Sequence, residues 1–315
     1  MEKSVANSTN SYDKEGSTTQ LVGSYHTWME FRSTVPATAV VLPMSIVGFI
    51  LINNVIILTV FYRMKKKLKY HHFYLIALAI GDLILAPPLF LTCYTMIAGG
   101  IRMTVYTCNT IGMMVIAPVT TTISIHCLMC MDKTVSILKP HIYQNFVSKR
   151  YSKVQIIAAL VCCFVLPLLY ISALSHANIL VFHFEASVCT CLPIWTILSY
   201  GAYGVLSVVG LTVEILSHIL IFRKILRMPK SNRTKIMKAT RTMLITVGAY
   251  YISWLPYSIM MLMQSFSRND FLSKWVIYTV TNLLIMNSCI NILIYICTLP
   301  GFSAHLMGPP RVGAG

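Results

Sequence analysis

The sequence predicts an all-α membrane protein in which a seven-transmembrane helix bundle forms a single domain. Of its 315 residues, 56% are hydrophobic and only 11% are charged, whereas about 25% of the residues of a soluble domain are charged. The apolar residues gather in seven long stretches, and about 20 helical residues are enough to cross the hydrocarbon core of a bilayer. The stretches are residues 35–62, 71–98, 106–137, 154–181, 197–222, 242–264 and 275–299.

Helices fit these stretches better than strands do. Each stretch is apolar all round and longer than the roughly ten-residue alternating segments of a transmembrane barrel. Only a helix satisfies its own backbone in lipid without pairing to a neighbour. We expect an extracellular tail at 1–34, one membrane domain at 35–299 without internal repeats, and a cytoplasmic tail at 300–315 whose end, "GPPRVGAG", is irregular.

The net charge of +16 is distributed unevenly between alternate loops. One set of loops carries 18 Lys and Arg residues and no acid, and the other set carries 6; the basic set is 63–70, 138–153, 223–241 and 300–315. Such an excess marks the cytoplasmic side. We therefore expect a plasma-membrane protein with an extracellular amino terminus and a cytoplasmic carboxyl terminus. The pattern favours contact with anionic membrane lipid and argues against nucleic-acid binding.

The extracellular side carries two modification signals. Asn7 begins an Asn-Ser-Thr glycosylation sequon in the amino-terminal tail. Cys108 opens the third stretch, and Cys189 and Cys191 follow the fourth. The long loop can fold back over the third helix, so we expect a disulfide between Cys108 and either Cys191 or Cys189. The cysteine spacing does not match a zinc site. No signal peptide is evident, so the first helix is expected to act as an uncleaved anchor.

Six short motifs, in order along the chain, resemble those of rhodopsin-like (class A) G-protein-coupled receptors. They are "NNVII" with Asn54, "LAIGD" with Asp82, the cysteine at 108, "DKTVSILKP" at 132–140, "YYISWLPY" at 250–257 and "NSCINILIY" at 287–295. Several switch positions depart from the family pattern. Lys133 stands for its Arg, Thr134 for its Tyr and Ile292 for its helix 7 proline, while Gly210 and His218 replace a Pro and a Tyr in helix 5.

The resemblance implies a switch for G-protein coupling, made by Asp132, Lys133, Tyr250, Trp254, Pro256, Asn291 and Tyr295. In the family a cation at the inner mouth is held by its neighbouring acid at rest and is released to meet the G protein. Lysine cannot form the bidentate fork of arginine, so we expect a looser lock and weaker or altered coupling. The simpler alternative is a boundary pair in which Lys133 neutralises Asp132 and reaches the interface.

The resemblance also implies a sodium site, which is the only cofactor expected. The matching residues all carry oxygen, which a hard cation prefers: Asp82, Thr122, Asn287, Ser288 and Asn291. The alternative is a plain network of interhelical hydrogen bonds around a protonated Asp82. Glu214 has no family role, and we expect a protonated acid bonded within the bundle.

The ligand pocket implied by the family is mostly apolar. Val115 stands where amine receptors carry Asp, and Ile285 stands where opsins carry the Schiff-base Lys. The carried-over positions are Val115, Ile116, Val119, Ala202, Leu206, Trp254, Tyr257, Ser258, Met261, Ile277 and Thr281. Such a lining suits a small uncharged or lipophilic extracellular ligand, including a chemosensory one. Glu185 and Asp270 in the outer loops would favour a basic peptide instead.

Three functions compete on these observations. The first is a receptor that relays ligand binding to a heterotrimeric G protein. The second is a receptor-like decoy or trafficking partner with lost or weak coupling, suggested by Lys133 and Ile292. The third is a transporter or channel, although the paired repeats and midplane charges typical of transporters are not evident. An enzyme is not expected, because no nucleophile–base pair or metal cluster can be recognised.

Overall fold

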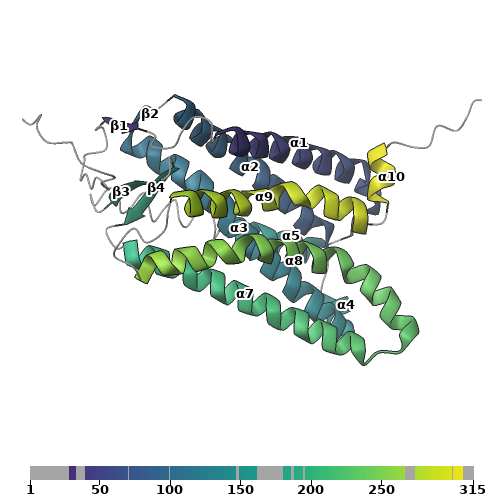
Figure 1. Ribbon diagram of the computed structural model, residues 1–315. Coiled ribbons are helices and arrows are strands. Elements are labelled where there is room, and N and C mark those ends of the chain that lie inside the picture. Colours follow the sequence, from purple (N-terminus) through teal and green to yellow (C-terminus); the bar gives the residue numbers. More distant parts are fainter. Residues whose placement is uncertain are drawn as a thin grey trace, which may run out of the picture.

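The computed structural model describes ten segments of the chain. They are residues 28–32, 40–69, 71–98, 100–146, 149–161, 180–185, 188–193, 196–266, 274–299 and 301–307. Figure 1 shows long helices that run side by side, with short strands at one end of the bundle and the small helices α4 and α10 at the other.

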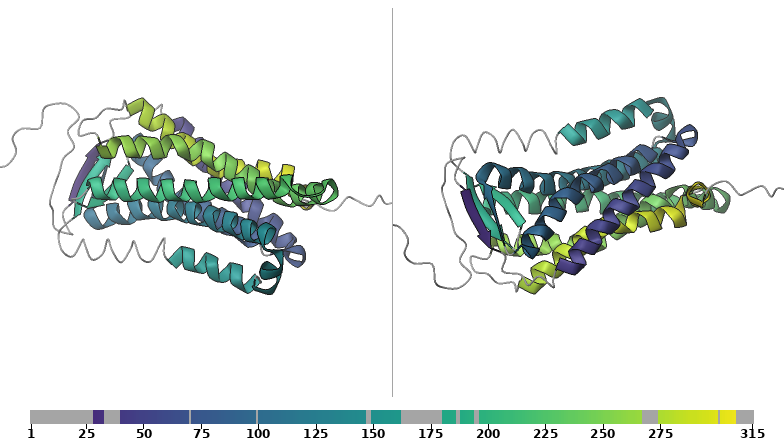
Figure 2. Two further views of the ribbon diagram at one scale, coloured as in Figure 1. Left: turned by 90° about the horizontal axis from the view of Figure 1, so that it is seen from below. Right: turned by 90° about the horizontal axis from the view of Figure 1, so that it is seen from above.

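The long helices form a closed ring. They are α1 (Val41–Arg63), α2 (His72–Ile97), α3 (Val105–Leu138), α5 (Lys149–Leu160), α7 (Thr196–Leu226), α8 (Lys230–Phe266) and α9 (Lys274–Thr298). Following the chain order, each of α1, α2, α3, α7, α8 and α9 contacts the next, and α9 returns to α1. Helix α5 packs against α2 and α3, as the two views of Figure 2 show. Six predicted stretches coincide with these helices; most of the remaining one, 162–179, lies outside the described residues.

The outer faces of the helices are apolar. In α1, the side chains of Phe49, Ile52 and Val55 are all more than half exposed, while Ile50 and Ile57 on the opposite face are fully buried. A soluble protein rarely exposes apolar patches of this size. Four described segments are long and apolar enough to cross a membrane, namely 41–63, 72–91, 240–260 and 278–298. The bundle is therefore built for lipid on its outside.

The structure adds short elements that the sequence analysis did not predict. Strand β1 (Trp28–Arg32), within the predicted tail, pairs antiparallel with β2 (Gly100–Thr104). Strands β3 (Leu180–Glu185) and β4 (Val188–Pro193) form a hairpin in the long outer loop. Helix α4 (Pro140–Phe146) follows α3, the short 3-10 helix η2 (Lys65–Lys67) follows α1, and α10 (Phe302–Met307) follows α9. These elements are short, so their sequences carry little periodic signal.

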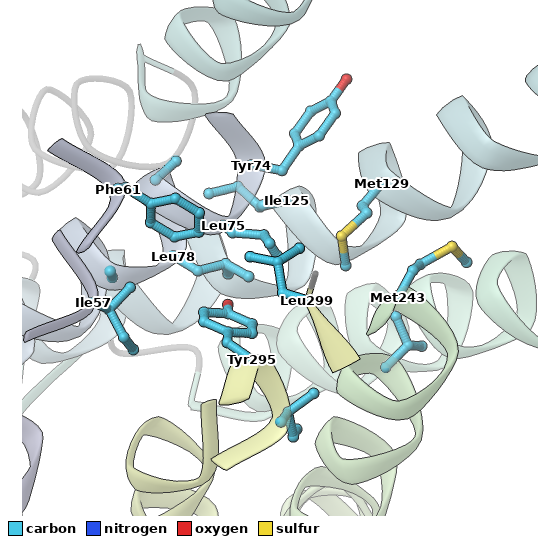
Figure 3. Packing of buried hydrophobic residues seen from close by; sticks show 14 of the residues in the cluster. Ile57, Phe61, Tyr74, Leu75, Leu78, Ile125, Met129, Met243, Tyr295 and Leu299 are labelled. Carbon is cyan, nitrogen blue, oxygen red and sulfur yellow. The ribbon is translucent and has the colours of Figure 1, made fainter. Parts of the chain in front are cut away.

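An aromatic group fixes α10 against the bundle. The rings of Phe61, Tyr295 and Phe302 have centroids 5.8–6.1 Å apart. They belong to the inner core, in which Phe61 and Tyr295 lie beside Leu78 (Figure 3). Gly301 adopts a positive φ of 81°, which glycine tolerates without steric cost. The chain can therefore turn sharply after α9 and return its next helix to the core.

Gly210 lies at a close contact between α7 and α3. A Cβ atom built there would lie 3.1 Å from Ile123 Cγ2 and 3.5 Å from Cys127 Sγ. Proline, which the family carries at this position, would bring more atoms into the same space. A residue without a side chain therefore allows these two helices to touch.

We expect Gly210→Ala to lower the stability of the bundle relative to Gly248→Ala, because overpacking typically costs about 1–3 kcal/mol. Gly248 is the matched control, since a Cβ built there meets no atom within 4 Å. Both changes gain the same helix propensity, so that contribution cancels. Thermal melting of the two purified variants measures the difference, and equal melting temperatures would contradict the close contact.

Candidate functional site

Asp82 is the centre of a buried polar network between α2 and α9. The Ser288 hydroxyl donates to its Oδ1 at 2.6 Å, and the Asn291 amide donates to its Oδ2 at 3.2 Å. All three side chains are buried. A carboxyl group cannot be left unpaired in a membrane interior without a large cost, so these bonds hold α9 against α2.

Two asparagines of α1 extend this network. The Asn54 amide donates to the Ile50 carbonyl at 3.0 Å and reaches the Ser288 carbonyl at 3.5 Å, and Asn53 donates to the Cys289 carbonyl at 3.1 Å. Helix α1 is therefore tied to α9 beside the residue that binds Asp82. The family motif in the sequence identified Asn54 but not its neighbour.

The predicted sodium ligands are brought together only in part. Asp82, Ser288 and Asn291 meet, whereas the Thr122 hydroxyl donates to the Pro118 carbonyl of its own helix at 3.0 Å. Asn287 is buried on α9, with no bond to Asp82 among the described residues. The Asn54 Oδ1 and Tyr295 hydroxyl are also buried without a partner in the described chain. The side chains of Asp82, Ser288 and Asn291 that meet in this network carry oxygens of the kind a hard cation prefers, and these residues would hold it.

The inner mouth of the bundle differs from the expected lock. Both Asp132 carboxylate oxygens accept from the Tyr143 hydroxyl of α4, at 3.0 Å each. Lys133 is buried and feels the Asp132 charge, but these two described side chains form no direct ion pair. The role of Asp132 in holding Lys133 therefore stays a prediction. Neighbouring residues on a helix point in different directions, so the acid faces α4 while the lysine turns away from it.

Lys133 lies in a basic environment instead. Lys69 and the two imidazoles of His71 and His72, at the start of α2, are all close enough to interact electrostatically with it. Tyr143 was missed in the sequence because it lies eleven residues after Asp132, which in one continuous helix would separate the two residues by about 16 Å. Only the turn into α4 brings it back.

Helix α8 carries a chain of aromatic contacts around Pro256. Tyr257 meets Trp254 at 5.9 Å between ring centroids, Trp254 meets Tyr250 at 5.4 Å, and Tyr250 stacks on His126 of α3 at 4.4 Å. Trp254 and Tyr250 are buried together with Ile123. The sequence pointed to Trp254 and Tyr250, and the structure adds His126 as their contact on α3.

The predicted pocket is described only in part. Among its described side chains, Trp254 is buried, and Tyr257, Ser258 and Thr281 are partly buried. The other predicted side chains lie outside the described ones: Val115, Ile116, Val119, Ala202, Leu206, Met261 and Ile277. All eleven positions belong to α3, α7, α8 and α9, which are neighbours in the ring.

Two extracellular features also remain predictions. Strand β4, which carries Cys189 and Cys191, contacts α3. The side chains of these cysteines and of Cys108 lie outside the described ones, so the choice of partner stays open. Asn7 lies outside the described residues.

The lipid-facing ring of helices and its buried polar core define a multi-pass membrane receptor. The family described as 7 transmembrane receptor (rhodopsin family) matches residues 53–295, which is more than half of the chain. The chain therefore belongs to the rhodopsin family of seven-transmembrane receptors, and the predicted family and bundle are confirmed. No curated protein matches the sequence.

We expect Tyr143→Phe to destabilise the receptor by about 1.5–3 kcal/mol, the typical contribution of a hydrogen bond to a charged group. Adding Asp132→Asn to Tyr143→Phe should cost much less than Asp132→Asn alone, because the shared bond is already lost. Thermal melting of the four proteins measures this coupling. Tyr94→Phe, at an exposed position of α2, is the control. Additive losses would show that the two residues act independently.

We expect sodium to raise the melting temperature of the receptor relative to an equal concentration of a large organic cation. A ligand that binds only the folded state adds about 2.7 kcal/mol at 100 times its dissociation constant. The gain should vanish in Asp82→Asn, which removes the negative charge but keeps an oxygen. A gain of equal size in Asp82→Asn and in the unmodified receptor would place the sodium effect elsewhere.

Proposed function

We propose that this receptor binds a small uncharged or lipophilic ligand from the extracellular side and activates a heterotrimeric G protein. Its family supports the receptor class. The observation that carries the proposal further is the aromatic chain from Tyr257 through Trp254 and Tyr250 to His126. A ligand seated above Trp254 would change the packing of α8 against α3, and α8 leads directly to the basic inner end of the bundle.

The pocket composition supports the ligand class. The described pocket positions offer three hydroxyl groups, on Tyr257, Ser258 and Thr281, beside the indole ring of Trp254. None of the eleven positions carries a charge. A charged ligand would lose its hydration there without an opposite charge to replace it, so a neutral ligand is favoured over a basic peptide.

The inferred orientation places the amino terminus outside the cell, in the plasma membrane. The basic residues support it, because η2, the start of α5 and the turn between α7 and α8 all carry Lys or Arg residues. In Figure 1, α4, α10 and the α7–α8 turn lie at the same end of the bundle. That end would face anionic lipid and the G protein.

A second candidate function is a receptor with weak or lost coupling. It is supported by Lys133, which lacks the fork of arginine, and by the bond of Asp132 to Tyr143 in place of a direct lock. Ile292 also lies buried in α9 where the family carries proline. Both candidate functions predict a folded receptor. They differ in whether the receptor stimulates nucleotide exchange on a G protein.

We expect Lys133→Arg to speed nucleotide exchange on a responsive G protein by up to roughly tenfold, the effect of one charge-assisted hydrogen bond. Lys133→Ala should reduce exchange to the level of empty membranes. The measurement is basal exchange by purified receptor in lipid nanodiscs with a set of heterotrimeric G proteins. Lys139→Arg, at an exposed position six residues further on, is the matched control. No exchange by any of these proteins would favour the uncoupled alternative.

A further inference from the structure

Glu214 is a buried acid that the family switch does not use. It lies on α7 with 0% of its surface exposed. The Cys127 thiol of α3 donates to its Oε1 at 3.5 Å. The Tyr251 side chain of α8 also lies close to the carboxyl group, and its hydroxyl donates to the Leu211 carbonyl at 3.2 Å. One side chain of α7 is therefore in contact with both α3 and α8.

The close helix approach at Gly210 places this acid. Cys127 Sγ lies 3.8 Å from the Gly210 carbonyl as well as against Glu214. Because Gly210 has no side chain, α3 can come near enough for its thiol to reach the carboxyl group one turn further along α7. The cluster therefore depends on glycine at position 210, where the sequence departs from the family pattern.

The groups that face Glu214 are neutral in their ordinary forms. They are Cys127 and Cys130 from α3 and Tyr250 and Tyr251 from α8. On its own helix, His218 Nδ1 lies 2.7 Å from the Glu214 backbone carbonyl. No Lys or Arg among the described residues forms an ion pair with the carboxyl group. Its Oε2 has no hydrogen-bond partner in the described chain.

An ionised carboxylate in this position would be strongly unfavourable. A buried charge without a counter-ion loses its hydration and gains nothing in return, and a lipid environment adds to that cost. A neutral carboxylic acid loses much less hydration free energy when it is buried, and it still accepts the hydrogen bond from Cys127 through Oε1. The burial, the neutral neighbours and the unpartnered Oε2 therefore point to a proton on this group.

We propose that Glu214 is a proton-binding site that couples protonation to the separation of α8 from α3 and α7. In the closed arrangement described here the carboxyl group holds its proton. When α8 moves away, Tyr251 leaves the cluster and water enters. The O–H bond of the acid then breaks, and the proton passes to a water molecule. The coupling of protonation to bundle opening rests on the movement of α8 in the proposed function. The protonation of the closed state does not depend on that movement.

The direction of the pH effect follows from the proton count. The closed state binds one more proton than the open state, so raising the pH favours the open state. Release of one proton changes the equilibrium between the two states by up to about tenfold per pH unit. The effect should be lost when residue 214 cannot ionise.

Infrared spectroscopy of the full receptor in nanodiscs tests the closed state without any ligand or G protein. We expect the carbonyl band of a protonated carboxylic acid at neutral pH, part of which is lost in Glu214→Gln and retained in Asp82→Asn. Glutamine keeps the size of the side chain, so a folded protein is expected, and size-exclusion elution checks it. If Glu214→Gln leaves the band unchanged, the acid is ionised and the proposal is overturned.

A fluorophore on α8 tests the coupling. Met237→Cys, at an exposed position of α8, carries the label in a Cys297→Ser background, because Cys297 is also exposed. We expect the open fraction to rise with pH in the parent protein and to be independent of pH in Glu214→Gln. Tyr251→Phe should shift the parent curve towards opening and keep its slope. The same slope in the parent and in Glu214→Gln would overturn the coupling, even if the receptor activates no G protein.

Discussion

The structure depends on one constraint, which is that polar side chains inside a lipid-embedded bundle must find their partners within the protein. Most hydroxyl groups do so locally, by donating to the carbonyl four residues earlier in the same helix. Examples are Thr59 to Val55, Thr134 to Cys130 and Ser253 to Ala249. Such bonds satisfy the side chain but connect nothing else. The buried acids accept bonds from donors on other helices, and these bonds tie the helices together.

Three acids make three separate connections. Asp82 joins α2 to α9, Asp132 joins α3 to α4, and Glu214 joins α7 to α3 with Tyr251 of α8 beside it. Each acid uses neutral donors, and none forms an ion pair within the described chain. Bonds to neutral donors are weaker than buried ion pairs but need no second desolvated charge. The bundle therefore gains defined contacts between helices from hydrogen bonds to buried acids.

The sequence was sufficient to predict the helix bundle and to identify the residues that carry charge inside it. Long apolar stretches have few alternatives in physical terms, and an acid within one stands out against its neighbours. The sequence was insufficient for partners that come from elsewhere in the chain. Tyr143 is brought back by the turn into α4, whereas Asn53 and Cys127 lie within α1 and α3 and meet partners on other helices, which local periodicity in the sequence cannot reveal. Asp132 and Lys133 form no ion pair in the described chain for a related reason, because adjacency in sequence is not adjacency on a helix surface.

The moving helix of the proposed switch is held in a different way from the fixed ones. Within the described residues, α8 contacts α3 through stacked rings, from Tyr250 to His126, and α7 through Tyr251. Aromatic contacts are worth about 0.5–1.5 kcal/mol each beyond the area they bury, and a neutral hydrogen bond is worth about as much. A ligand shifts an equilibrium only by the difference between its affinities for the two states. A ligand that moves α8 must therefore offset these contacts together with the packing of α8 against α7 and α9.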